Sequence, residues 1–364
     1  MGGATMAKSS KPKSENGKLD ALEELSKELP LFSDTDYATD VKSIPSGSIA
    51  LDMAIGVGGY PRGSIVDVFG GESAGKSLLS IMAIAQVQKQ GGLAVVWDAE
   101  RSYSKNMNWM RVNGVDTSKL KFLKLRPTEG CELGFDAVEK ICKAGVVDLI
   151  VIDSIPSLVP QAALDREIME HEILGRRAAK VGQACARLVG LLDESKTTVM
   201  FINQIRANIV SGPAAAFAPK TKETTNFSLR HFSSLRLQVS KISKPKMVNG
   251  LPYSHRVKVV AVKNKVSSPY RTAEFDICYT KGVDTVAEVA DILIGSDEAK
   301  KAGAWISWDG NKYQGRDGFV EGLRDSKVFD KAFKQAMSLT DKVNLFGVVD
   351  DKDDDSVTVE EVDQ

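Results

Sequence analysis

The 364-residue sequence contains little cysteine and little histidine. Its three histidines are scattered, and its four cysteines lack the close pairing that zinc sites and disulfide frameworks use. This spacing argues against a disulfide-stabilised secreted scaffold and against a zinc-binding motif. We expect the cysteines to be reduced residues that pack in the core; they are Cys131, Cys142, Cys185 and Cys278.

The sequence also lacks a long hydrophobic run. No segment approaches the ~20 apolar residues that span a bilayer, and the polar, lysine-rich start (MGGATMAKSSKPKSENGK) has no apolar stretch of the kind found in signal peptides. With 43% hydrophobic residues the chain can still bury a large core. We therefore expect a globular cytoplasmic protein, with no membrane partner.

Net charge is absent as well, because 48 basic and 48 acidic residues cancel. The balance conceals an asymmetry: residues 350–364 (DDKDDDSVTVEEVDQ) contain eight acids and one lysine, so the rest of the chain carries a net charge of +7. Such a tail can act as a solubilising extension, or it can compete with phosphates for the basic surface. The sequence leaves both interpretations open.

The middle of the chain repeats a pattern of strand, loop and helix. Continuous apolar runs are typical of parallel strands that helices cover on both faces. Segments 235–242 and 256–265 come closer to alternating apolar with polar residues, which favours an antiparallel extension. The sequence therefore predicts an α/β fold around a mainly parallel sheet. The continuous runs are 65–70, 93–98, 120–125, 148–154 and 198–204.

The sequence predicts that the chain divides into four parts. Residues 1–36 combine a disordered basic start with a short helix at 18–29, which we expect to dock on the main domain or on a neighbouring subunit. Residues 37–282 form the main domain. Residues 283–345 form a small α/β C-terminal lobe, and residues 346–364 form the disordered acidic tail.

A glycine-rich motif, G-x-x-x-x-G-K-S, follows the first of these strands and precedes an apolar helical stretch. Its glycines let backbone N–H groups turn toward phosphate oxygens, Lys76 reaches the β- and γ-phosphates, and Ser77 offers a hydroxyl group to Mg²⁺. The motif therefore predicts a site for ATP and Mg²⁺. Its residues are Gly70, Gly71, Glu72, Ser73, Ala74, Gly75, Lys76 and Ser77.

Acidic residues at the ends of two other apolar runs can complete this site. Asp153 ends one run, and a carboxylate there can hold Mg²⁺ through its water shell. Asp98 and Glu100 stand at the end of another, and either could orient or deprotonate a water beside the γ-phosphate. Strand alternation places these two carboxylates on the same face, so spacing alone does not choose between them.

Over residues of about 40–325 the chain resembles the RecA recombinases. The resemblance rests on IPSGSIALDMAIGVGGYPRGSIVDVFGGESAGKS, VVWDAERSYS, LIVIDSIPSLVP, VMFINQIR, RVKVVAVKNKVSSPYRTAEFDI and AGAWISWDG. It implies a P-loop RecA-type core and an ATP-dependent recombinase that forms a helical filament on single-stranded DNA and exchanges strands with homologous duplex DNA. Loader and single-strand-binding proteins are further partners that it implies. The divergence of the sequence suggests a virus-encoded member.

The resemblance also assigns roles that spacing leaves open. It makes Glu100, and not Asp98, the residue that polarises the attacking water. Gln204 matches the glutamine that senses the γ-phosphate, and Lys263 and Lys265 match a lysine pair that reaches the ATP of a neighbouring subunit. From the residues alone, the two lysines could equally be a solvated strand face, since alternation puts both on one side.

Two polar segments, 160–177 and 206–230, occupy the places of the family's DNA-binding loops. Loops of that length without regular structure usually have a function. The second segment combines basic residues with Phe217 and Phe227, a mixture that follows a phosphate backbone and stacks on bases. The candidate DNA-binding residues are Arg176, Arg177, Arg206, Lys220, Lys222, Phe227 and Arg230.

The chain departs from the family in three places. Thr225 and Asn226 stand where the family has paired glycines, and the second segment is longer. Met107 occupies the place of the tyrosine that stacks on the nucleotide base, and Tyr103 is the candidate replacement. Arg176 and Arg177 could also form salt bridges on a helix surface instead of contacting phosphates.

Two other functional classes share a P-loop core. A ring-shaped helicase or DNA-translocating motor would ordinarily carry a larger N-terminal domain than the ~35 residues before this core. A regulatory or metabolic ATPase would give no reason for two long segments on the face that Gln204 reaches. The recombinase filament therefore accounts for the most features.

Overall fold

The structure is a computed structural model that describes residues 41–126, 128–165, 170–207, 221–223 and 227–344. The chain divides into a unit that ends at Val41 and a unit that begins at Lys42, and the fold described here is that of the second unit. The expected helix at 18–29 and the acidic tail lie outside the described residues. Nowhere in the described ranges is a helix both long enough and apolar enough to cross a bilayer.

The described strands include one close to each predicted apolar run. They are β1 (Ser43–Ile44), β2 (Tyr60–Pro61), β3 (Ile65–Gly70), β4 (Ala94–Asp98), β5 (Lys121–Leu123), β6 (Leu149–Asp153), β7 (Thr198–Ala207), β8 (Thr221–Glu223), β9 (Leu235–Lys241), β10 (Lys246–Val248), β11 (Leu251–Asn264), β12 (Thr272–Cys278), β13 (Gly282–Val283), β14 (Lys300–Ala302), β15 (Trp305–Trp308) and β16 (Asn311–Gln314).

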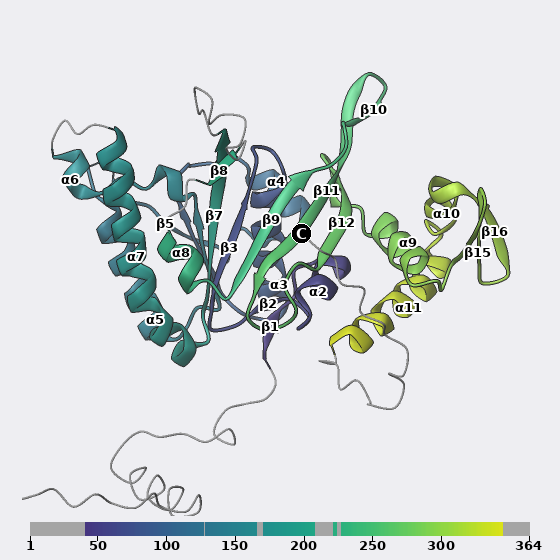
Figure 1. The fold of residues 1–364 in the computed structure, drawn as a ribbon, viewed down its shortest axis with the longest axis horizontal. Helices are drawn as coiled ribbons and strands as arrows, with labels where there is room; N and C mark the ends of the chain where they lie inside the picture. Colours follow the sequence, from purple (N-terminus) through teal and green to yellow (C-terminus); the bar gives the residue numbers. More distant parts are fainter. Residues whose placement is uncertain (1–40, 127, 166–169, 208–220, 224–226, 345–364) are drawn as a thin grey trace, which may run out of the picture. The chain divides into compact units, whose positions relative to one another are not determined.

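The central sheet has the order β13-β12-β11-β9-β3-β7-β6-β4-β5 (Figure 1). The pairs from β9 through β3, β7, β6 and β4 to β5 are parallel, whereas β9, β11, β12 and β13 pair antiparallel. The predicted mainly parallel sheet with an antiparallel extension is therefore confirmed. β9 joins the two regions, since it is parallel to β3 and antiparallel to β11.

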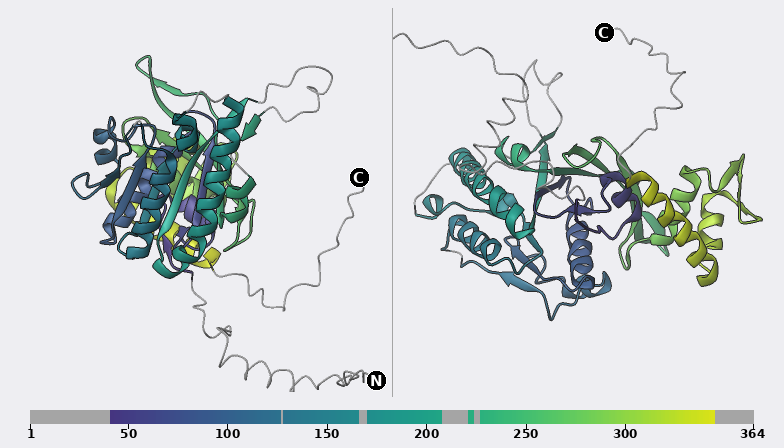
Figure 2. Two further views of the ribbon diagram at one scale, coloured as in Figure 1. Left: turned by 90° about the vertical axis from the view of Figure 1, so that its left-hand side faces the viewer. Right: turned by 90° about the horizontal axis from the view of Figure 1, so that it is seen from below.

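Helices cover both faces of this sheet (Figure 2). Alternate strand residues face opposite ways: Val66 and Val68 pack in the core that α3 fills, whereas Ile65 packs in the core that α5 and α7 fill. The described helices are α2 (Ile49–Ile55), α3 (Lys76–Lys89), α4 (Met107–Val112), α5 (Cys131–Ala144), the 3₁₀ helix η2 (Ile155–Ser157), α6 (Gln161–Leu164), α7 (Glu170–Ser195), α8 (Phe227–Phe232), α9 (Thr285–Gly295), α10 (Gly315–Gly322) and α11 (Ser326–Asn344).

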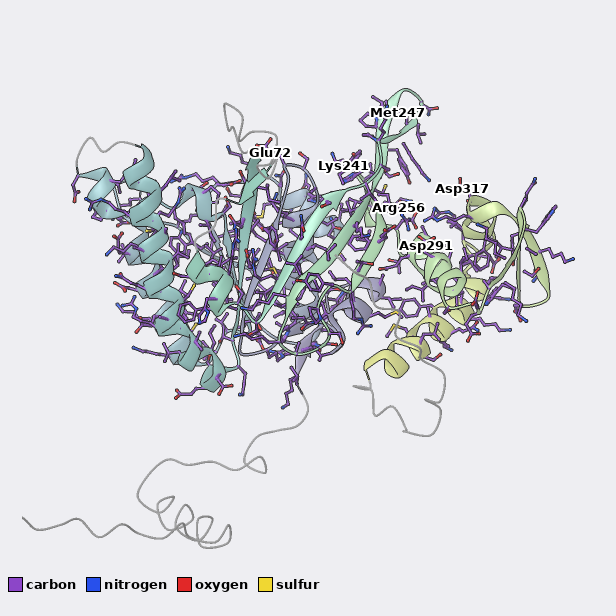
Figure 3. The ribbon with its side chains drawn as sticks, viewed as in Figure 1. Glu72, Lys241, Met247, Arg256, Asp291 and Asp317 are labelled. Atoms are coloured by element: carbon purple, nitrogen blue, oxygen red, sulfur yellow. The ribbon has the colours of Figure 1, made fainter. Side chains whose placement is uncertain are left out.

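A small C-terminal lobe follows the sheet and contains α9, the sheet β14-β15-β16, α10 and α11. Its core includes Phe319 and Leu323 and extends to Ile49 of α2. Arg256 of β11 and Asp291 of α9 approach to 2.9 Å where the main sheet meets the lobe (Figure 3). Arg316 of α10 donates to Asp276 of β12 at 2.9 Å, so charged pairs as well as apolar packing hold the lobe in place.

Candidate nucleotide site and DNA interface

The phosphate-binding motif forms the turn between β3 and α3. A side chain at Gly70 would place its Cβ 2.1 Å from the carbonyl oxygen of Val239, so β9 lies too close for any residue but glycine. Gly75 caps α3 with a φ of 103°, which also favours glycine. The first backbone N–H groups of α3 have no partner within the helix, and this arrangement binds anions.

Lys76 and Ser77 stand at the first turn of α3. The Lys76 ammonium group donates to the carbonyl oxygens of Gly70 at 3.1 Å and Gly71 at 2.6 Å, so it lies over the turn. The Ser77 hydroxyl donates to Oδ2 of Asp153 at 3.0 Å. The motif on β3 and the carboxylate at the end of β6 therefore meet at one place, as the sequence predicts.

Burial and neighbouring charge shift two pKa values here. Burial lowers the pKa of Lys76, against the opposing effect of the Asp153 and Glu100 carboxylates. Burial and the nearby Glu100 raise the pKa of Asp153 to about 6, although the Ser77 hydrogen bond lowers it. A cation beside Asp153 would offset both causes of the increase, because it favours the ionised carboxylate.

The residues at this turn fit Mg²⁺ in the form that accompanies a nucleotide. Mg²⁺ usually keeps several waters and takes one or two protein oxygens together with phosphate oxygens. Ser77 and Asp153 present such a pair. Within the described part of the chain, no group of three or more histidine, cysteine or acidic residues is placed to hold a metal ion. The pair of Ser77 and Asp153 fits a metal ion that arrives with phosphates.

The structure gives the two carboxylates at the end of β4 different hydrogen-bond partners. Asp98 accepts the backbone N–H groups of Ser102 at 2.8 Å and Ser104 at 3.1 Å, so it holds the following turn. Strand alternation does not extend to Glu100, because β4 ends at Asp98. The backbone N–H of Glu100 instead donates to the carbonyl of Asp153 at 3.1 Å, which brings its side chain beside the Mg²⁺ candidates.

Glu100 meets Gln204 and Ser154. The Gln204 side-chain amide, on β7, donates to Oε1 of Glu100 at 2.9 Å, and the hydroxyl of Ser154 donates to the same oxygen. Ser154 is fully buried. We did not predict Ser154 from the sequence. The available signal was its place directly after Asp153, where a strand end turns toward the site.

A model of the RecA N-terminal domain family matches residues 26–284. The chain is 36% identical to Protein RecA of Chlorobaculum parvum over 305 residues, which cover 84% of this chain and 85% of the relative. It is 38% identical to Protein RecA of Campylobacter fetus over 325 residues, with 86% and 88% coverage. Protein RecA of Porphyromonas gingivalis is 37% identical over 305 residues, with 84% and 85% coverage.

The chain belongs to the RecA family. The resemblance seen in the motifs is confirmed, and with it the function of an ATP-dependent DNA recombinase and repair protein. The ring-helicase alternative is not favoured. The relatives named here are bacterial, and the comparisons give no support to a viral origin.

In this RecA-family chain, Tyr103 does not occupy a base-stacking position. Its side chain is only 2% exposed, and its hydroxyl lies 2.6 Å from the Ser80 hydroxyl inside the α3 core. A ring enclosed in this way cannot stack on a nucleotide base. The prediction from sequence was wrong because packing turned Tyr103 inward, where its hydroxyl meets that of Ser80.

Lys263 and Lys265 lie far from the phosphate turn of their own chain. The backbone N–H of Lys265 donates to the carbonyl of Ser234, whose own N–H donates to the carbonyl of Ile65, at the start of β3. The phosphate turn follows the opposite end of β3, about 17 Å away at ~3.3 Å per residue. The ammonium group of Lys263 donates to the carbonyls of Arg230 at 2.6 Å and His231 at 2.8 Å, in the last turn of α8.

The first candidate DNA segment is more regular than we expected. Residues 161–164 form α6, and α7 begins at Glu170, so Arg176 and Arg177 lie within a helix. Arg176 is exposed. Arg177 is only 8% exposed, and its guanidinium group donates to the carbonyl of Pro156 in η2. Arg177 is therefore not presented to DNA phosphates in this structure; it is buried and makes a hydrogen bond to the backbone.

The second segment begins as a strand. β7 continues through Arg206, which pairs with Lys222 of the short strand β8, so two candidate DNA residues are adjacent on antiparallel strands. Phe227 begins α8, and Arg230 is exposed on the same helix. Lys220 lies outside the described residues. The first end of the segment is thus connected to the site through Gln204 on β7. Its other end, α8, contacts Lys263, which lies at the far end of β3 from the phosphate turn.

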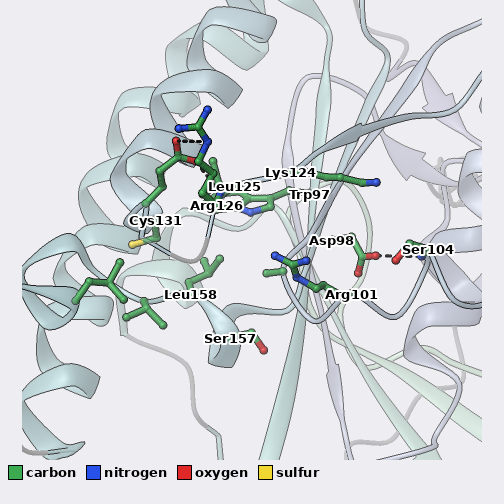
Figure 4. A pocket seen from close by; sticks show the side chains of 14 residues that line it. Trp97, Asp98, Arg101, Ser104, Lys124, Leu125, Arg126, Cys131, Ser157 and Leu158 are labelled. Carbon is green, nitrogen blue, oxygen red and sulfur yellow. Dashed lines mark hydrogen bonds and ion pairs between the residues drawn. The ribbon is translucent and has the colours of Figure 1, made fainter.

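A pocket of about 440 Å³ lies beside this site, at the ends of β4 and β5 (Figure 4). Trp97 forms an apolar part of its wall, and Arg101, Lys124 and Arg126 contribute positive charge. Its described lining includes none of the residues of the phosphate turn. Its lining does include Ala99 and Arg101, which flank Glu100, and Ser157 of η2.

Proposed function

We propose that this RecA-family protein assembles as a helical filament on single-stranded DNA, binds ATP with Mg²⁺ at the junction of neighbouring protomers, and catalyses homologous pairing and strand exchange. The observation that carries the proposal is the position of Lys263 and Lys265. They belong with the triphosphate by family resemblance, yet they lie at the other end of β3 from the phosphate turn of their own chain. The lysines of a neighbouring copy can instead approach the phosphate turn from outside the protomer.

Each residue then has a role in hydrolysis. The turn and Lys76 hold the β- and γ-phosphates, and Ser77 and Asp153 hold Mg²⁺, which neutralises phosphate charge when bound. Glu100 orients the attacking water and accepts its proton as the bond between the γ-phosphorus and the bridging oxygen breaks. The neighbour's Lys263 and Lys265 stabilise negative charge on the phosphoryl group, as an arginine finger does in other P-loop enzymes. Hydrolysis would therefore require assembly.

Gln204 would connect this chemistry to DNA. Its amide contacts Glu100 at 2.9 Å and is carried by β7, the strand from which the second candidate DNA segment departs. An oxygen of the γ-phosphate offers the same amide an alternative acceptor. Redirecting Gln204 would pull on β7 and change how the segment meets DNA. ATP would then favour tight DNA binding and hydrolysis would loosen it.

Electron microscopy with single-stranded DNA and a non-hydrolysable ATP analogue tests the assembly. We expect helical fibres. A closed hexamer would instead support the ring motor. We also propose that the protein acts in the bacterial cytoplasm, where genomic DNA is present, and that loader and single-strand-binding proteins control its access to single strands.

A further inference from the structure

Arg177 lies on the inner face of α7. Residues that follow it at helical spacing form the buried stripe of that helix, with Val181 at 1%, Ala184 at 3% and Leu188 at 1% exposure. Arg177 continues this stripe at 8% exposure, whereas Arg176 is exposed. A buried guanidinium group needs acceptors, and Arg177 donates to the carbonyl of Pro156. The helical phase could have been seen in the sequence and argues against a DNA contact.

The carbonyl that Arg177 binds lies close to Glu100 along the chain and its hydrogen bonds. Pro156 is the middle residue of η2, a single 3₁₀ turn in which the N–H of Ser157 donates to the carbonyl of Ser154 at 3.0 Å. The hydroxyl of Ser154 donates to Oε1 of Glu100. One turn of chain therefore separates the guanidinium group on α7 from the carboxylate that orients water.

The segment after η2 is fixed on its other side as well. The backbone N–H of Gln161 donates to Glu132 at 2.9 Å, and the side-chain oxygen of Gln161 accepts the N–H of Gly130 at 2.7 Å, so α5 holds the end of the segment. Arg177 holds its beginning from α7. The contact from Arg177 to η2 comes from α7, the helix that closes the first candidate DNA segment.

We propose that Arg177 is a positioning residue for ATP hydrolysis, which ties α7 to η2 and, through Ser154, fixes the orientation of Glu100. This inference rests on the proposed function, because it requires that Glu100 orients the attacking water. If Arg177 has this role, both candidate DNA segments are connected to the same side chain, Glu100. The first reaches Oε1 of Glu100 through Arg177, η2 and Ser154, and the second reaches the same oxygen through Gln204.

A positioning role and a phosphate contact predict different measurements. Removal of a phosphate contact weakens single-stranded DNA binding and reduces the slope of log affinity against log salt by about 0.7. Removal of a positioning contact leaves affinity and slope intact and lowers kcat, because a small displacement of a catalytic group can cost about 100-fold in rate. The KM for ATP stays near its wild-type value, since the phosphate turn is untouched.

The test uses the full-length protein with poly(dT) and ATP, and compares Arg177→Met with Arg187→Met. Arg187 is a matched control, since it lies on the same helix and carries the same charge but is 53% exposed and pairs with Asp136. We expect Arg177→Met to lower DNA-stimulated kcat about 10- to 100-fold with unchanged DNA affinity and salt slope. Arg187→Met should keep wild-type turnover. An unchanged kcat, or a reduced salt slope, in Arg177→Met would overturn the inference.

Two further variants guard against a folding defect. Arg177→Lys keeps a cation and one donor, so it should recover part of the lost kcat if its thermal midpoint matches that of Arg177→Met. Ser154→Ala should lower kcat in the same way, and the double variant should lose no more than the stronger single variant, because both act on Glu100. Additive losses would show that Arg177 does not act through Ser154. If the wild-type protein itself lacked DNA-stimulated hydrolysis, the proposed function would fail instead.

Discussion

Gln204 of β7 and Glu100, just beyond β4, share a 2.9 Å hydrogen bond in which the amide donates to Oε1. The strand β6 lies between their strands in the sheet, and the backbone carbonyl of Asp153 at its end holds the N–H of Glu100. Parallel neighbours with ends on the same edge bring together residues that lie more than a hundred positions apart in the sequence. The proposed catalytic carboxylate and the proposed phosphate sensor are therefore in direct contact.

Replacement of Glu100 by glutamine should separate ATP binding from hydrolysis. The amide keeps the Oε1 acceptor for Gln204 and Ser154 but loses the negative charge that draws a proton from water. We expect turnover to fall about 10²- to 10⁴-fold, with ATP binding retained and a long-lived filament. Phosphate release and filament lifetime measure the two effects. Normal turnover in Glu100→Gln would contradict the role of Glu100 in activating water. Asp98→Asn is the control, and it should mainly reduce thermal stability.

Replacement of both Lys263 and Lys265 by alanine should stop DNA-stimulated hydrolysis without unfolding the protomer. Hydrogen exchange should then distinguish the two single variants. Lys263→Ala should raise amide exchange in α8, because the carbonyls of Arg230 and His231 lose a charged donor. Lys265→Ala serves as the comparison and should leave α8 protected. Unchanged DNA stimulation in the double variant would refute the role of the lysines in the neighbour's site.

Tyr103→Phe should change stability and not base recognition. The variant keeps the ring but removes the hydroxyl that contacts Ser80. We expect a loss of about 1 kcal/mol in the free energy of unfolding, with the same preference among ATP, GTP and CTP as the wild type. Competition binding with the three nucleotides checks the second point. A changed preference would mean that Tyr103 reaches the base after all.

Glu288 should make the protein less stable as pH rises. It is fully buried beneath α2, where its Oε1 accepts the Ser48 hydroxyl and the N–H of Ala50 at 3.1 Å, and burial raises its pKa from 4.5 to about 7. The folded state therefore holds a proton that the unfolded state releases above pH 4.5. Its stabilisation is full below that pH and is lost as pH rises toward about 7, by up to about 1.4 kcal/mol per pH unit.

Glu288→Gln isolates this effect, since the amide keeps the acceptor oxygen but does not titrate. Denaturant unfolding of both proteins between pH 5 and pH 8 measures the difference. We expect a shallower decline for the variant. Some decline should remain, because burial also raises the pKa of Asp52 to about 7. Identical slopes would show that Glu288 does not titrate in this interval.

Removal of residues 350–364 should raise affinity for duplex DNA and make it more sensitive to salt. The deletion removes eight acids and one lysine, so phosphates meet less competition for the basic body of the protein. Duplex binding measured at several salt concentrations tests this. Unchanged affinity and slope would assign the tail a solubilising role.

The sequence by itself determined the class of fold, the phosphate turn and the family. Buried parallel strands must be apolar on both faces, and a turn that wraps phosphate must contain glycine, so these features remain visible without coordinates. The order of the strands also placed Lys76, Ser77 and Asp153 correctly in one site. All of these depend on local patterns or on the common edge where parallel strands end.

Only the tertiary structure decided which polar side chains face one another. Asp98 and Glu100 could not be told apart by spacing, because the end of β4 lies between them and breaks the alternation. Tyr103 and Arg177 were both assigned to ligands, yet packing turned both inward, where Ser80 and the carbonyl of Pro156 provide hydrogen-bond partners. A side chain's direction depends on the neighbours that distant strands and helices supply, and those neighbours exist only once the chain has folded.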